Sequence, residues 1–181
     1  NLQNIMKLEE NYLPEQQRNQ IYDWIHNNEY LDDDYNGKRC FAVTYKKEDL
    51  PDFLKFVIKG NYNVYNFIGF YTFENGYIEP HVDGDLVERI KEEQPDFMIF
   101  LPETEVYYVD ICPEMTGGEI VVDDVQYKPL TNSSIVLPAG AEHSVNSVKY
   151  QKNLRTTLVC EKYFILSKYL KRLESPWYHK G

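Results

Sequence analysis

Hydrophobic and polar positions divide the chain into a helix-like first third and a strand-like remainder. Ile21, Trp24 and Ile25 recur at i, i+3 and i+4 after a proline and a glutamate, which predicts an amphipathic helix over residues 14–25. Residues 48–60 predict a second helix, because acids and a proline stand at its start, lysines near its end and a glycine at its C-terminal cap. Both helices are expected to pack against a sheet.

From Asn63 onward, short β-rich runs alternate with turns rich in Gly, Pro, Asn and Asp. These runs predict eight strands, over residues 64–73, 77–82, 97–101, 105–111, 119–122, 134–137, 144–148 and 155–164. Eight short strands after two helices indicate a mainly β fold with flanking helices, a double-stranded β-helix or cupin-like jelly roll. Residues 166–173 predict a terminal helix, followed by a tail over residues 175–179.

The length of 181 residues is that of one ordinary domain. We expect one domain over 1–181, with a helical N-terminal part to about residue 60, a core over about 63–165 and a C-terminal helix and tail over 166–181. No apolar run approaches the roughly eighteen residues of a membrane span, and no signal-peptide pattern opens the chain, which predicts a cytoplasmic protein without a membrane partner. The pattern does not indicate an oligomeric state.

Composition narrows the classes of function. The formal net charge is -10, so a polyanion would be repelled at long range and nucleic acid is not the expected partner. Cys40, Cys112 and Cys160 are too few and too far apart for a disulfide framework or a zinc site, and fit reduced core thiols. The 16 tyrosines suit either a pocket or peptide groove, or simple packing on strand faces.

The candidate chemistry lies in two histidines and an aspartate. His81 and Asp83 are two residues apart, so an extended strand would place both side chains on one face. Asp85 is a poorer ligand candidate because it does not have this spacing. With His143, the pair completes a two-His, one-carboxylate triad, which leaves three positions open on an Fe(II) ion.

Arg155 follows in an apolar, β-branched run, where a buried cation needs an anionic partner. Thr157 shares the face of Arg155 on a regular strand, so its hydroxyl is a further candidate for the same anion. An ordinary ion pair of Arg155 with one of the 29 acids is the alternative.

The order His81, Asp83, a Gly117-Gly118 turn, His143 and Arg155 resembles the Fe(II)- and 2-oxoglutarate-dependent oxygenases, in particular their prolyl 4-hydroxylase-like branch. The resemblance spans residues 63–164. It implies Fe(II), O₂ and 2-oxoglutarate as co-substrate, with ascorbate as an optional reductant. It also implies that Arg155 and Tyr108 bind the distal carboxylate of 2-oxoglutarate, and that Tyr71 either lines the pocket or simply packs.

Two departures refine the resemblance. Nucleic-acid demethylases of this superfamily carry a second arginine where this chain has Glu161, and halogenating members lack the carboxylate that Asp83 supplies. Hydroxylation of a C–H bond, with release of succinate and CO₂, is therefore the implied reaction. Arg155 at the clamp position is similar to the bacterial and oxygen-sensing prolyl hydroxylases, a resemblance that concerns the fold and does not establish proline as the substrate. A peptidyl prolyl residue or a related side chain is the expected target.

Two alternatives stay open at this point. One is a hydroxylase of the same superfamily that acts on a small molecule, and the other is a cupin-like protein that binds a metal or acidic ligand without turnover. The acidic segment over residues 85–96 follows the first two ligands directly, and it is either a mobile loop that covers the substrate or an exposed connector.

Overall fold

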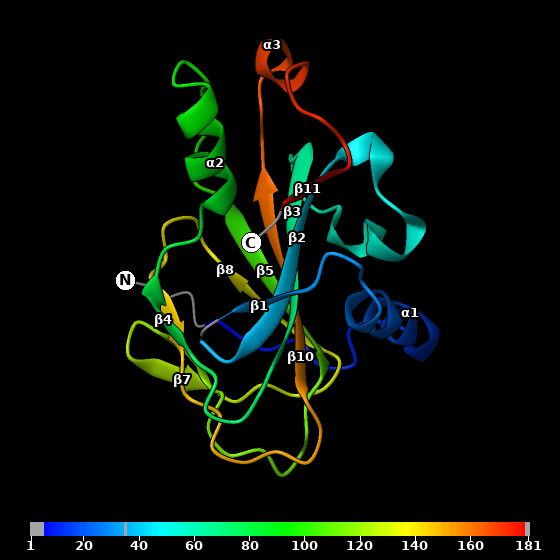
Figure 1. Ribbon diagram of the computed structural model, residues 1–181, viewed down its shortest axis with the longest axis vertical. Helices are drawn as coiled ribbons and strands as arrows, with labels where there is room; N and C mark the ends of the chain where they lie inside the picture. The colour runs from blue at the N-terminus through cyan, green and yellow to red at the C-terminus, as the bar shows by residue number, and fades with distance from the viewer. Residues whose placement is uncertain (1–5, 35, 180–181) are drawn as a thin grey trace.

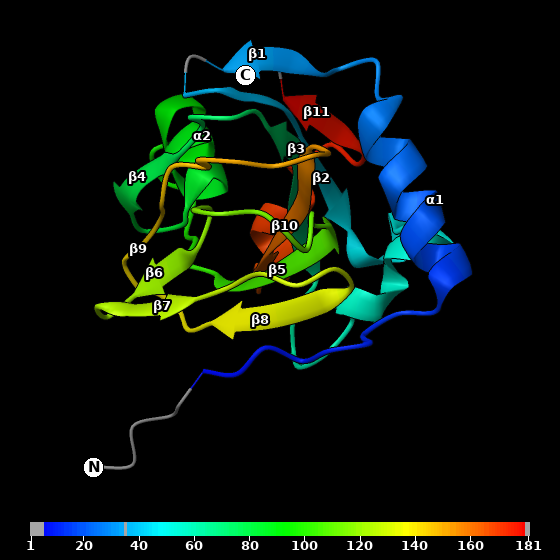
Figure 2. The same cartoon turned by 90° about the horizontal axis from the view of Figure 1, so that it is seen from below.

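Two antiparallel sheets form the framework in the computed structural model, which describes residues 6–34 and 36–179. The larger sheet has the order β1-β2-β3-β10-β5-β8, with β11 also paired to β2, and the smaller has the order β4-β9-β6-β7. Figure 2 shows the two sheets facing each other across the interior. The mainly β jelly-roll prediction is confirmed. Residues 1–5 of the predicted N-terminal part and 180–181 of the tail lie outside the described residues.

The strands of the larger sheet are β1 (Asp32–Asp34), β2 (Lys38–Lys46), β3 (Val64–Thr72), β5 (Glu103–Asp110), β8 (Ser133–Leu137), β10 (Arg155–Tyr163) and β11 (Trp177–His179). Those of the smaller sheet are β4 (Ile78–His81), β6 (Ile120–Val122), β7 (Val125–Tyr127) and β9 (His143–Val145). The helical elements are α1 (Glu15–His26), α2 (Asp85–Glu93), α3 (Ser167–Leu170) and the 3-10 helices η1 (Lys47–Asp49) and η2 (Asp52–Val57).

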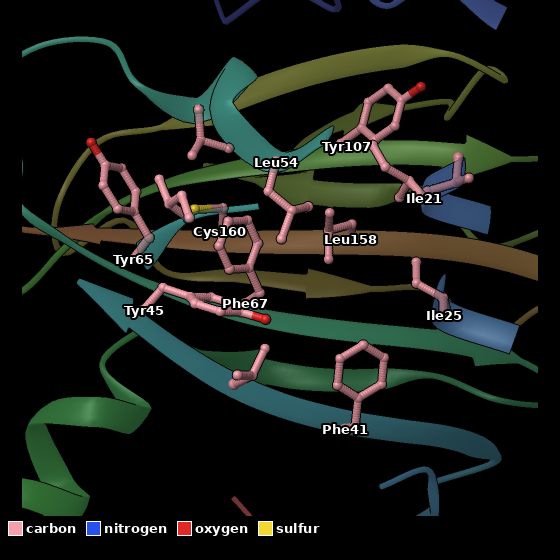
Figure 3. Close-up of a cluster of buried hydrophobic side chains, with 14 of the residues drawn as sticks. Ile21, Ile25, Phe41, Tyr45, Leu54, Tyr65, Phe67, Tyr107, Leu158 and Cys160 are labelled. Atoms are coloured by element: carbon pink, nitrogen blue, oxygen red, sulfur yellow. The ribbon is translucent and has the colours of Figure 1, made fainter. Parts of the chain in front are cut away.

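The outer face of the larger sheet is covered by α1 and η2 (Figure 1). Ile21 and Ile25 of α1 are completely buried, as their i, i+4 spacing predicts, and they belong to one core cluster with Phe67 and Leu158 of the central strands (Figure 3). A second cluster fills part of the space between the sheets, where Tyr108 of β5 is completely buried. Both faces of β3 and β10 are therefore covered, which explains why these strands are almost wholly buried.

The predicted helix over residues 48–60 is wrong. This segment forms the two short 3-10 helices η1 and η2, separated at Leu50, which is extended with φ -60° and ψ 128°. Leu50 precedes Pro51, and the proline ring excludes the α conformation from the residue before it. The acids and lysines that resemble helix caps therefore flank a proline break.

Several other boundaries differ from the prediction. The segment 97–101 alternates buried Phe97 and Ile99 with exposed neighbours, as a strand would, but it lies between two prolines and forms no strand. The acidic segment 85–96 contains α2, which buries Leu86 and Ile90 at i, i+4. The C-terminal helix is shorter than predicted.

Strands β1, β2, β7 and β11 were not predicted, although β2 pairs with β3 over its whole length and β11 lies within the predicted tail. His179 of β11 is buried and its Nε2 atom lies 2.8 Å from the Thr44 hydroxyl, so a polar tail is the wrong description of these residues. In the described part of the chain, no helix combines the length and the apolar character that crossing a membrane would require.

A buried ion pair joins β10 to β5 on the helix-covered side of the sheet. Lys162 Nζ lies 2.7 Å from Glu105 Oε2, and both side chains are at most 2% exposed. Glu105 also accepts hydrogen bonds from Ser134 and Tyr12. The pair is costly to desolvate, but breaking it would be worse because one charge would be left uncompensated.

We predict that Lys162→Met lowers the free energy of unfolding by about 3–5 kcal/mol, because Glu105 would remain buried without its cation. Urea denaturation followed by circular dichroism measures the change. Adding Glu105→Gln should restore a large part of the loss, since a glutamine oxygen still accepts from Ser134 and Tyr12. Equal losses in the single and double variants would contradict this explanation.

Candidate functional site

The smaller sheet brings the three candidate metal ligands together. His81 is the last residue of β4 and His143 the first of β9, and the two are direct partners in the antiparallel register. Asp83 lies in the bend after β4, so the backbone turn, and not a continuing strand, places its side chain beside both rings. One donor atom from each of the three residues lies within 4.8 Å of the others, a group that could hold a metal ion.

The two imidazole rings are fixed by backbone carbonyls. His81 Nδ1 lies 2.9 Å from the Glu79 oxygen, and His143 Nδ1 lies 3.0 Å from the Ala141 oxygen. Since a carbonyl oxygen can only accept, each Nδ1 atom carries the proton of its hydrogen bond. Each Nε2 atom is then the nitrogen available to a metal, and an outer hydrogen bond of this kind is the usual means of orienting a histidine ligand.

Both Nε2 atoms are directed at one carboxylate. The distances are 3.2 Å from His81 Nε2 to Asp83 Oδ1 and 3.4 Å from His143 Nε2 to Asp83 Oδ2. If both Nε2 atoms are unprotonated, their lone pairs and the two carboxylate oxygens repel one another at this spacing unless a proton or a metal cation lies between them. The arrangement therefore fits a divalent metal with nitrogen and oxygen ligands.

Protonation at the triad follows the same charges. The hydrogen bond with Asp83 raises the pKa of His81, against the opposing effect of burial. Burial alone would raise the pKa of Asp83, but the hydrogen bond from His81 and the charge of His143 lower it. Asp83 is therefore ionised at neutral pH, as a metal ligand must be.

Beside the triad is a cavity of about 170 Å³, the inner cavity, which extends between the sheets to Arg155. His81, Asp83 and His143 line one part of it, and Arg155, Tyr108 and Thr157 line another. The cavity is smaller than a typical drug-sized ligand site, so it suits a small co-substrate. The structure thus brings the metal candidates and three of the predicted anion-binding residues to the same enclosed space.

Arg155 is 1% exposed and forms no ion pair with any of the described residues. Its guanidinium donates to Thr157 Oγ1 at 3.0 Å and to the Gly118 oxygen at 3.3 Å, while its Nε atom has no hydrogen-bond partner. Burial lowers the pKa of Arg155. A buried guanidinium without a carboxylate is costly, so an anion in the inner cavity would stabilise it.

Tyr108 supports the same conclusion. Its hydroxyl is completely buried and has no hydrogen-bond partner, and the Arg155 guanidinium lies 5.4 Å from its ring centre. Thr157 and Tyr108 are cross-strand partners on β10 and β5, and both line the inner cavity beside Arg155. Burial raises the pKa of Tyr108 to about 12, which keeps the hydroxyl protonated and able to donate.

The glycine turn predicted from the sequence lies beside Arg155 at one end of the inner cavity. Gly117 and Gly118 both have positive φ, 73° and 74°, and a Cβ atom on Gly117 would lie only 2.0 Å from the Ser147 oxygen. Only glycine fits this position without displacing the chain. The turn presents the Gly118 oxygen to Arg155 and so fixes the orientation of the guanidinium.

Tyr71 is the one predicted site residue that lies elsewhere. It projects from β3 toward the outer face, where its ring stacks on His26 at 4.7 Å and its hydroxyl accepts from Arg39. The neighbouring Phe70 lines the inner cavity instead, because successive side chains on a strand point to opposite faces. The register of β3, which a single sequence does not fix, decides between the two residues.

Two residues of the site were not anticipated as such. Lys38 of β2 is 8% exposed and lines the inner cavity, but β2 itself was not predicted. Glu161, noted only for the arginine it replaces, accepts the backbone N–H of Gly84, next to Asp83, at 3.1 Å. Glu161 is an even number of residues from Arg155 and Thr157, so all three share one face of β10. This spacing was the feature of the sequence that could have placed Glu161 at the site.

The comparisons with known proteins concern structure alone. No family model matches the sequence, and no curated protein matches it significantly. A 2OG-Fe(II) oxygenase family oxidoreductase from Burkholderia pseudomallei has a similar structure, with a TM-score of 0.59 and 15% identity, covering 87% of this chain and 84% of the other. A Pseudomonas putida prolyl-4-hydroxylase is similar with a TM-score of 0.60 and 13% identity, and the match covers 88% of this chain and 92% of the other.

A third similar structure is a Trichoplax adhaerens prolyl hydroxylase in complex with a peptide fragment of the hypoxia inducible factor oxygen degradation domain. It has a TM-score of 0.60 and 12% identity, covering 95% of this chain and 89% of the other. The chain has the fold of the 2-oxoglutarate and Fe(II) oxygenases. At these identities the comparison establishes the fold, while the chemistry rests on the side chains described above.

We predict that purified protein binds one Mn(II) or Fe(II) ion, and that His143→Ala weakens this affinity by more than roughly 100-fold, because a first ligand is lost. Titration calorimetry with Mn(II) measures both. His26→Ala is the matched control, since His26 stacks between Tyr22 and Tyr71 on the outer face. Wild-type affinity in His143→Ala would show that the ligand assignment is wrong.

Proposed function

We propose that this chain is an Fe(II)- and 2-oxoglutarate-dependent dioxygenase that hydroxylates a C–H bond of a peptidyl prolyl residue. The observation that carries the proposal is the joint geometry of the inner cavity. A His-Asp-His group with converging donor atoms lies in the same small cavity as a buried arginine that has no ion pair among the described residues. The fold shared with the oxygenases supports this assignment.

His81, Asp83 and His143 would hold Fe(II) on one side and leave its remaining positions for other ligands. The carbonyls of Glu79 and Ala141 keep each Nε2 atom directed at the ion. When bound, Fe(II) with 2-oxoglutarate and O₂ supplies the oxidation, in which succinate and CO₂ are released and one oxygen atom enters a C–H bond.

Arg155, Tyr108 and Thr157 would hold the carboxylate of 2-oxoglutarate that is distant from the metal. Arg155 offers its planar fork, and the free Nε and Tyr108 hydroxyl are buried donors that such a carboxylate satisfies. Apolar residues such as Val106, Ile120 and Val159 line the rest of the inner cavity and exclude water from the co-substrate.

A peptide is the substrate class that the surroundings favour. A second cavity, of about 400 Å³, shares His81 and Asp83 with the inner cavity and extends to exposed residues of α2. A substrate could therefore approach the metal from the surface while 2-oxoglutarate occupies the inner cavity. One of the similar structures is a prolyl hydroxylase that holds a peptide, which supports the same choice.

We predict that Arg155→Ala weakens 2-oxoglutarate binding by about 2–4 kcal/mol, roughly 30- to 700-fold in Kd, because a charge-assisted fork is lost. Calorimetry with the Mn(II)-loaded protein measures this. Mn(II) affinity should persist, since Arg155 is not one of the ligands. The 2-oxoglutarate affinity of Arg155→Lys should lie between those of the wild type and Arg155→Ala, because lysine keeps the charge but not the planar fork. Unchanged co-substrate affinity in Arg155→Ala would refute the clamp.

We further predict that prolyl peptides increase succinate release above the rate measured without substrate, and that the peptide gains the mass of one oxygen atom. Mass spectrometry of the products, with free amino acids and other small metabolites tested in parallel, provides the measurement. Oxygen addition to a free metabolite, with none to any peptide, would replace the peptidyl assignment by a small-molecule hydroxylase.

A further inference from the structure

The second cavity, which we name the mouth cavity, has an unusual distribution of charge. It is lined by His81 and Asp83 of the triad, by Asp85, Glu88 and Arg89 of α2 and by Glu161 of β10, among others. Asp85 is ion paired with Arg89 at 2.9 Å, while Glu88 is exposed to solvent. Besides Asp83, the lining thus has three carboxyl groups and one guanidinium, so acidic side chains outnumber basic ones.

Glu161 is the buried member of this group, with an exposure of 1%. Its Oε1 atom accepts from Asn66 Nδ2 at 2.8 Å and from the Tyr163 hydroxyl at 2.9 Å, and its Oε2 atom accepts from Gly84 N at 3.1 Å. A carboxylate offers about four acceptor positions, so three are used and one remains on Oε2. The side chain lines the mouth cavity, where a ligand donor could use this position.

Glu161 has hydrogen bonds but no ion pair with any described residue, and burial raises its pKa to about 7, so a cation bound beside it would favour its ionised form. The contrast with Glu105 is informative, because that equally buried glutamate has Lys162 at 2.7 Å. The fold thus supplies an internal cation for the glutamate on one face of the sheet and none for the glutamate that lines the cavity.

Strand β10 carries two buried charges of opposite sign on one face. Arg155 and Glu161 are six residues apart, so they project to the same side, one into the inner cavity and the other into the mouth cavity. Each lacks an oppositely charged partner among the described residues. Arg155 suits the anionic co-substrate, and by the same electrostatic argument Glu161 suits a cation.

We propose that the mouth cavity binds a positively charged side chain, an ammonium or guanidinium group, of the peptide substrate, with Glu161 at its inner wall and Glu88 at its entrance. This inference rests on the proposed function, since it takes the peptide to be the substrate of the metal centre. The preferred substrate is then a prolyl peptide with a lysine or arginine next to the proline.

The substrate provides the first test. Three prolyl peptides are compared that differ only in the residue beside the proline, which is lysine, norleucine or glutamate. Norleucine keeps the aliphatic chain without the charge. The lysine peptide should exceed the norleucine peptide in kcat/KM by roughly tenfold or more, as one charge-assisted hydrogen bond predicts, and the glutamate peptide should be the poorest.

Variants of the chain provide the second test. Glu161→Gln keeps the size of the side chain and removes its charge, so the preference for lysine over norleucine should be lost. Glu88→Lys should reduce that preference by repulsion. Glu92→Lys is the matched control, because Glu92 lies one turn further along α2, is exposed and does not line the mouth cavity.

Binding measurements separate recognition from damage to the site. The affinity of each peptide for the Mn(II)- and 2-oxoglutarate-loaded protein is measured by calorimetry, as is the Mn(II) affinity of Glu161→Gln. Lost lysine preference with retained Mn(II) affinity supports the proposal. If Glu161→Gln also loses Mn(II) affinity, the proposal is decided by comparing the lysine preference of Glu88→Lys with that of Glu92→Lys. A reduced preference in Glu88→Lys alone supports the cation site, and equal preferences in the two variants contradict it.

The outcomes also distinguish this inference from the proposed function. Hydroxylation of all three prolyl peptides at similar rates would overturn the cation site and leave the dioxygenase assignment intact. Oxygen found on the lysine side chain itself would support the cation site and overturn the prolyl target. If no peptide is oxidised or bound, the peptidyl function fails and the inference with it.

Discussion

The alternation of side chains along β10 is the constraint on which the site depends. This strand pairs with β3 on one side and β5 on the other, and it is buried over almost its whole length. Residues Leu158 and Cys160 enter the helix-covered core, while Arg155, Thr157 and Glu161 face the interior of the jelly roll. The same packing that stabilises the sheet therefore fixes the separation between the two charged residues.

The sequence predicted those parts of the site that depend on residue type and on the order of residues along the chain. The candidate ligands and Arg155 were predicted from residue type and chain order, and the structure brings them to one cavity. The reason given for the spacing of His81 and Asp83 was only partly right, because β4 ends at His81 and a bend positions Asp83. A short polar motif thus predicted which side chains lie together better than it predicted the backbone that carries them.

Long-range contacts account for what the sequence did not reveal. Tyr71 and Phe70 are adjacent, and only the pairing of β3 with its neighbours decides which of them faces the interior. Strand β2 was missed because strands were sought only from Asn63 onward and residues 26–47 were assigned to no element, and with it the place of Lys38 was missed. In the segment after Leu50, one proline outweighed several weak helix signals.

The direct pairing of His81 with His143 has a consequence for the smaller sheet. Its four strands are only three or four residues long, and such short strands gain little stability from their own hydrogen bonds. An ion held by both histidines and by Asp83 would act as a cross-link between β4 and β9, and it would bind the folded state more tightly than the unfolded chain. Metal occupancy is then coupled to the local opening of this sheet, so slow amide hydrogen exchange in β4 and β9 would report the loading of the site.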